Sequence, residues 1–191
     1  MNSNSILIAI IGIGAIVLIV LGLTVILSAR KKSSLKLREK FGPEYDLALE
    51  KSGDQRLAEV TLKEREKRVS SLEIHDLSES ERNRYHGEWV EIQTAFVDDP
   101  SKSVEEAHRL ITEVMIARGF PVVDFEQRAE DLSVLYPNLV TNYRSANAIT
   151  LKNQSSRCST EEIRQAMVNY RSLFEELLGA AQAKEVVVPG K

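Results

Sequence analysis

Cysteine is nearly absent from this chain of 191 residues, which has only Cys158. An intrachain disulfide needs two thiols and a cysteine-rich metal site needs several, so both are excluded. The three histidines, His75, His86 and His108, have no metal-ligand spacing among themselves, and no H-E-x-x-H motif occurs. We therefore expect no metal and no cofactor, and a reducing compartment fits the thiol content.

Motifs of catalysis are missing as well. The sequence has no glycine-rich phosphate loop and no G-x-S-x-G nucleophile elbow. Two carboxylate pairs are present, but helix capping explains Asp98 with Asp99, and a solvent-facing helix explains Glu126 with Glu130. Catalytic residues stay unknown at this stage. An enzyme is the alternative interpretation, as a membrane-tethered hydrolase or lyase that uses Asp or Glu with Tyr and Arg.

Basic residues are scarce outside one short segment. The chain has 25 basic and 28 acidic residues, and residues 30–40 contain six of the basic and one of the acidic ones, with no charged side chain before them. From Phe41 onward 19 basic residues therefore stand against 27 acidic residues, a net charge of −8. Nucleic-acid binding needs basic surface to neutralise phosphates, so we expect no nucleic-acid partner.

Charged side chains are absent from residues 6–27. A helix of about 22 apolar residues spans roughly 33 Å, which matches the core of a bilayer. A signal peptide has a shorter apolar region and a basic leader, so residues 1–29 are predicted to be a transmembrane anchor. Because basic residues follow this segment and none precedes it, we expect the N-terminus outside a bacterial inner membrane and the C-terminal domain in the cytoplasm.

The basic residues after the anchor also suit contact with anionic lipid headgroups. Those assigned to this contact are Arg30, Lys31, Lys32 and Lys36. Within the anchor, Ala15, Gly22 and Ala29 are spaced by seven and give a smooth face, which leaves a homo-oligomer open.

The rest of the chain is predicted to be all-α, because no segment alternates like a strand. Residues 30–77 are interpreted as a basic collar and a charged helical stalk, in which a coiled coil is only weakly marked. Residues 78–179 are predicted to be a compact soluble bundle of about five helices, and residues 180–191 a flexible tail. Capping residues mark most of the helix starts, and Gly119, as a left-handed C-terminal stop, and Gly179 are expected to end two of the helices. Pro137 is expected to open one helix, and residues 153–157 are expected to form a loop.

Aromatic residues make up only 6% of the chain, and many lie between residues 85 and 149. A small bundle has limited interior, so we expect part of this aromatic surface to be exposed and to bind a protein partner. A repeated Asn-Tyr-Arg-Ser sequence, at residues 142–145 and 169–172, places a Tyr on an apolar stripe with an Arg beside it. The two arginines either extend to solvent or flank a cleft for an anion. The candidate binding residues are Trp89, Phe96, Arg118, Phe120, Phe125, Tyr136, Tyr143, Arg144 and Arg171.

Several motifs carry a resemblance to a known family, namely residues 96–100, 118–122, 124–129, 131–134 and 142–144. With these motifs, residues 41–178 resemble a family of uncharacterised bacterial proteins usually labelled hypothetical, membrane or secreted. The resemblance implies a bacterial origin and a shared helical domain, and it implies no reaction. Relatives often read Asp-His-Pro where this chain has Leu135, Tyr136 and Pro137, and His where it has Asn147, so a site built on those histidines would be missing here.

Overall fold

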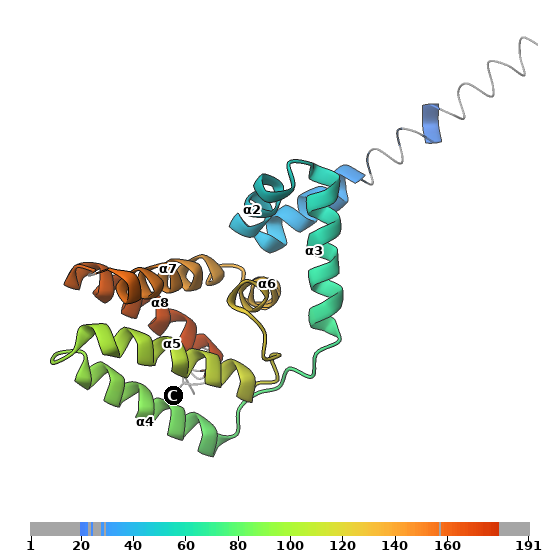
Figure 1. The fold of residues 1–191 in the computed structure, drawn as a ribbon. Helices are drawn as coiled ribbons and strands as arrows, with labels where there is room; N and C mark the ends of the chain where they lie inside the picture. Colours follow the sequence, from blue (N-terminus) through green and yellow to red (C-terminus); the bar gives the residue numbers. More distant parts are fainter. Residues whose placement is uncertain (1–19, 23, 25–27, 29, 157, 180–191) are drawn as a thin grey trace, which may run out of the picture. The chain divides into compact units, whose positions relative to one another are not determined.

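The computed structural model describes residues 20–22, 24, 28, 30–156 and 158–179 (Figure 1). All regular structure in these residues is helical, which confirms the all-α class. The chain divides into two compact units after Lys40. The second unit contains α2 (Pro43–Ser52), α3 (Gln55–Ser70), α4 (Glu79–Ala95), α5 (Pro100–Ala117), α6 (Phe125–Leu135), α7 (Val140–Ser155) and α8 (Thr160–Leu177).

In the first unit the structure describes a helix that includes residues 30–40. The predicted anchor, residues 1–29, lies almost entirely outside the described residues, and so does the predicted tail. Among the residues that are described, no helix combines the length and the apolar character needed to cross a membrane.

Side-chain caps start the helices at the expected places. Ser78 with Glu81 and Ser159 with Glu162 form complete capping boxes, while Asp124 accepts a hydrogen bond from the backbone N–H of Gln127. Each cap satisfies a backbone donor that has no partner within its helix. The N-cap residues that accept such a bond are Asp54, Ser78, Asp99, Asp124 and Ser159.

Two predicted boundaries around α7 are wrong. Pro137 does not open the helix, because residues 137–139 form a turn and α7 begins at Val140. The expected loop at residues 153–157 is helical up to Ser155, where the serine hydroxyl donates to the backbone carbonyl of Leu151 at 3.3 Å. Bonds of this kind let a polar residue stay in the helix, which composition alone does not show.

Helices α4 to α8, called the bundle below, share one hydrophobic core. Neighbouring helices pair, α4 with α5 and α7 with α8, and α5 also packs on α8 (Figure 1). Trp89 of α4 stacks on Phe174 of α8 with ring centroids 4.6 Å apart. Tyr143 and Tyr170 are fully buried between the helices. The five helices expected after residue 78 are therefore present in the described part of the chain.

Helices α2 and α3, called the α2–α3 hairpin below, do not form part of a separate solvated stalk. They pack against each other, and α3 packs on α6 (Figure 1). The chain divides after Lys40 and not after Leu77. The stalk interpretation treated the charges of α3 as solvated, whereas Arg65 is only 3% exposed and binds carboxylates of α2 and α6.

Gly119, just after α5, crosses close to the backbone of the connection from α3 to α4. This glycine ends α5 with a φ of +92°, which confirms the predicted left-handed stop. A Cβ at this position would lie 2.3 Å from the backbone carbonyl oxygen of Glu73. Only glycine fits, because it accepts a positive φ and has no side chain to collide with residue 73.

Candidate binding groove

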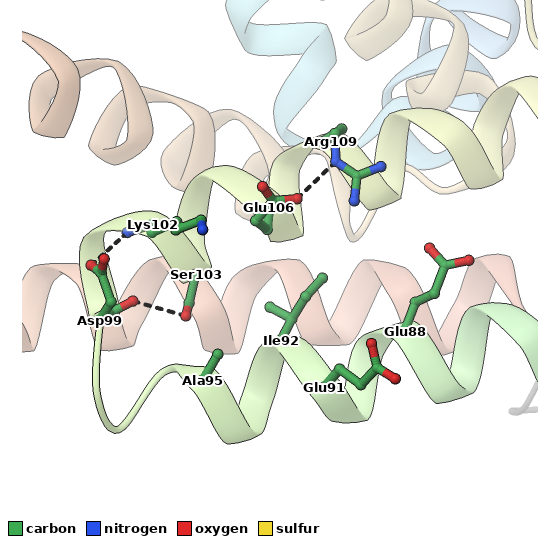
Figure 2. Close-up of a pocket in the computed structure, with 9 residues that line it drawn as sticks. All are labelled: Glu88, Glu91, Ile92, Ala95, Asp99, Lys102, Ser103, Glu106 and Arg109. Atoms are coloured by element: carbon green, nitrogen blue, oxygen red, sulfur yellow. Dashed lines mark hydrogen bonds and ion pairs between the residues drawn. The ribbon is translucent and has the colours of Figure 1, made fainter.

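A groove runs between α4 and α5, with a volume of about 300 Å³ (Figure 2). Its apolar floor includes Ile92 and Ala95 of α4, and Ile92 is only 8% exposed. The remaining lining residues are polar or charged and come from α4, α5 and the turn between them. They are Glu88, Glu91, Asp99, Lys102, Ser103, Glu106 and Arg109.

Capping bonds fix the end of the groove near the α4–α5 turn. The Asp99 carboxylate accepts a hydrogen bond from the Lys102 backbone N–H at 3.0 Å. The Ser103 hydroxyl donates to the Asp99 carbonyl at 2.8 Å (Figure 2). Pro100 starts α5 directly after this cap, and its ring fixes its φ angle. The backbone is therefore restrained at Asp99 by the capping bonds and at Pro100 by the ring.

The opposite end is held by ion pairs along one face of α5. Arg109 donates to Glu106 at 2.8 Å and also binds Glu113. The hydrogen bonds that Arg109 donates to the two carboxylates raise the pKa of its guanidinium. Glu88 of α4 is 3.8 Å from Arg84, a loose pair on the helix surface. Such exposed pairs contribute little stability, so their charges can be redirected to a ligand at small cost.

Four carboxylates and two cations line the groove and give it a formal charge of −2. Glu91 is exposed. A shallow apolar floor with a carboxylate rim suits an aliphatic stem that ends in a cation, as in lysine or arginine. In the part of the chain that the structure describes, no group of three His, Cys, Asp or Glu residues is placed to hold a metal ion.

The structure does not bring the predicted binding residues together on one surface. Trp89, Arg118, Phe120 and Tyr143 are buried. The side chains of these four residues therefore pack in the interior and offer no exposed binding surface. The half-buried candidates are Phe96, Phe125, Tyr136 and Arg144, and Arg171 is exposed.

The two Asn-Tyr-Arg-Ser repeats do not flank a common cleft. Arg144 binds Glu44 at 2.9 Å and Glu126 at 2.9 Å, whereas Arg171 binds Glu175 on its own helix at 2.7 Å. Both tyrosines of the repeats are buried, which agrees with the interpretation that they pack in the core. Each arginine is thus occupied by a different set of carboxylates.

A polar cluster inside the bundle bears on the enzyme alternative. His108 Nδ1 lies 3.0 Å from the Tyr170 hydroxyl, which lies 3.0 Å from the Thr150 hydroxyl. Burial, and secondarily the charge of Arg128, lowers the pKa of His108. Burial also raises the pKa of Tyr170 and of Tyr143. The cluster is therefore neutral at pH 7, and its contacts suit a structural role inside the bundle.

The residues expected to contact lipid headgroups lie on the helix of the first unit, and all four are exposed. Sequence reasoning missed the groove, because it weighted aromatic residues and assigned the charges of α4 and α5 no role beyond helix capping. The available signal was the short α4–α5 turn. A turn of this length makes the two helices antiparallel neighbours, so the charged side chains beside their contact face each other across the line where the helices meet.

Comparisons with models of known protein families, with curated proteins and with solved structures give no match. The resemblance to uncharacterised bacterial proteins stays a prediction.

Proposed function

We propose that the chain is a single-pass membrane protein of bacteria whose helical domain binds a protein partner at the cytoplasmic face. The α4–α5 groove carries this proposal, because it combines an apolar floor with a rim of exposed and half-buried carboxylates. The predicted anchor and the basic residues after it support the membrane location. The partner class that fits is a protein segment with lysine or arginine side chains.

Site-specific photo-crosslinking in bacterial membranes tests the groove. With a benzophenone amino acid in place of Glu91, the full chain should give a discrete cross-linked protein band. The same probe at Thr141, an exposed position on α7, should give none. Adding Glu88→Lys changes the formal charge of the probed groove from −1 to +1 and should remove the band. Equal cross-linking from both probe positions, or a band that survives the charge change, would contradict the proposal.

Maleimide labelling tests the orientation. Cys158 is half-buried, so it should be replaced by Ser and an exposed cysteine placed at Thr141. We expect a membrane-impermeant maleimide to label this cysteine only after the inner membrane is opened. Labelling of intact spheroplasts as strong as labelling after lysis would place the domain outside.

A further inference from the structure

Charged side chains join the α2–α3 hairpin to the bundle. On α3, Arg65 lies 2.9 Å from Glu130 of α6, and Arg68 lies 3.2 Å from Glu130 and 2.7 Å from Asp131. Within the hairpin itself, Glu44 of α2 lies 3.2 Å from Arg65 of α3. These contacts form one half of what we call the ionic interface.

The other half of the ionic interface centres on Arg144 of α7. It lies 2.9 Å from Glu44 of α2 and 2.9 Å from Glu126 of α6, and Glu126 also lies 3.2 Å from Lys51 of α2. Burial disfavours ionisation of Glu126, but the hydrogen bonds from Arg144 and Lys51 outweigh it and lower its pKa. The hairpin brings three cations and one carboxylate to the interface, and the bundle brings three carboxylates and one cation, so the two sides have charges of +2 and −2.

Apolar contacts do not connect the two parts in the same way. The hydrophobic core cluster of the described residues contains no side chain from α2 or α3. The hairpin instead buries its own set of apolar side chains. They are Tyr45, Ala48, Ala58, Leu62 and Val69. Docking of the hairpin on the bundle therefore depends on charge more than on a shared core.

Some buried polar atoms of the ionic interface have no hydrogen-bond partner in the described structure. Asp131 is fully buried, and its Oδ2 has no hydrogen-bond partner in the described structure, nor has Nε of Arg65. Burial raises the pKa of Asp131, and this effect is larger than the opposite effect of the hydrogen bond from Arg68, which lowers it. If the hairpin separated from the bundle, the charged groups of the ionic interface would be hydrated by water. The free energy gained by this hydration offsets much of the electrostatic attraction that is lost.

The connection between the two parts allows such a separation. Residues 73–78 are not helical, and Arg118 holds their C-terminal portion by donating to the carbonyl oxygen of His75 and to the Asp76 carboxylate, both at 3.2 Å. Leu77 belongs to the core of the bundle. A change of angle at residues 71 and 72, before the crossing of Glu73 with Gly119, can therefore move the hairpin without disturbing this anchor point.

We propose that the α2–α3 hairpin is a releasable arm, docked on α6 and α7 by the ionic interface and able to open while the bundle stays folded. Opening exposes a face of α6 and α7 that bears Glu126, Glu130 and Asp131. The device is independent of the groove and of its ligand.

Spin-label distance measurements on the full chain in lipid nanodiscs test the arm. Labels are placed on Cys replacing Lys63 of α3 and Ser145 of α7, both exposed, in a Cys158→Ser background. The double change Glu130→Gln/Arg144→Gln should raise the fraction of long distances by at least about tenfold, because it removes partners of buried charges. Raising NaCl from about 0.05 M to about 1 M should shift the distribution the same way by a smaller amount.

The matched control, Glu161→Gln/Arg171→Gln, also removes one charge of each sign, from surface pairs of α8, and should leave the distances unchanged. Fluorescence of Trp89, the only tryptophan, reports on the core of the bundle and should not change in any variant. An unchanged distance distribution in the Glu130→Gln/Arg144→Gln chain would overturn the proposal. Loss of the native Trp89 signal together with opening would also overturn it, since hairpin and bundle would then be one cooperative unit.

Discussion

Arg118→Ala is expected to lower the free energy of unfolding by about 1–3 kcal/mol, the cost of leaving a buried hydrogen-bond acceptor without its donor. The Arg118 side chain is 9% exposed and donates to four groups. Besides His75 and Asp76, it binds the Tyr136 hydroxyl at 2.7 Å and the carbonyl oxygen of Leu177 at 3.1 Å. Truncation leaves these acceptors without their donor, and a buried acceptor without a partner is costly.

Urea unfolding followed by circular dichroism measures the effect of Arg118→Ala. Arg109→Ala is the matched control, because its guanidinium is 53% exposed and its pairs lie on one helix face. We expect a change of less than about 0.5 kcal/mol for the control. Arg118→Lys should recover only part of the loss, since an ammonium group cannot reach four acceptors with the geometry of a guanidinium. A loss for Arg118→Ala no larger than that of the control would refute the role assigned to this residue.

Trp89→Ala is expected to cost about 3–5 kcal/mol of stability, as for other large buried aromatics. Trp89 is 4% exposed and stacks on Phe174 at an interplanar angle of 17°. Truncation removes this contact and leaves a cavity between α4 and α8. Trp89→Phe keeps most of the volume and should recover much of the loss.

The Trp89 result also separates a core residue from a binding residue. The melting temperature of Trp89→Ala should fall by roughly 6–20 °C, because about 1 kcal/mol corresponds to roughly 2–4 °C in a unit of the size of residues 41–191. A melting temperature within a few degrees of the parent would show that this side chain does not support the core. Trp89 would then return to the list of binding residues.

Local signals in the sequence predicted the helices well. The serine and aspartate caps and the stops at Gly119 and Gly179 follow from backbone chemistry within a few residues, so they can be recognised without knowledge of the fold. Pro137 is the exception. Proline suits both the first turn of a helix and a tight turn that precedes one. Here Pro137 lies in the tight turn before α7, and only the packing of the chain decides between these two positions.

Long-range pairing of charges could not be predicted. Arg65 and Glu130 are 65 residues apart, and Glu44 and Arg144 are 100 apart. Nothing in the local pattern of α3 distinguishes a solvated arginine from one bound across a helix junction. For this reason the sequence alone favours a stalk over residues 30–77, and it points to aromatic residues, several of them buried in the core, instead of to the α4–α5 groove.

The backbone crossing at Gly119 has a consequence for recognising distant relatives. Helical segments of similar composition arise easily in unrelated chains, whereas a glycine preceded by an arginine that binds residues 75 and 76 is a demanding combination. A chain that keeps this crossing must keep glycine at position 119, since any side chain would meet the carbonyl of residue 73. An acidic residue at position 76 with Arg-Gly at positions 118 and 119 is therefore a more selective signature of this fold than the helices themselves.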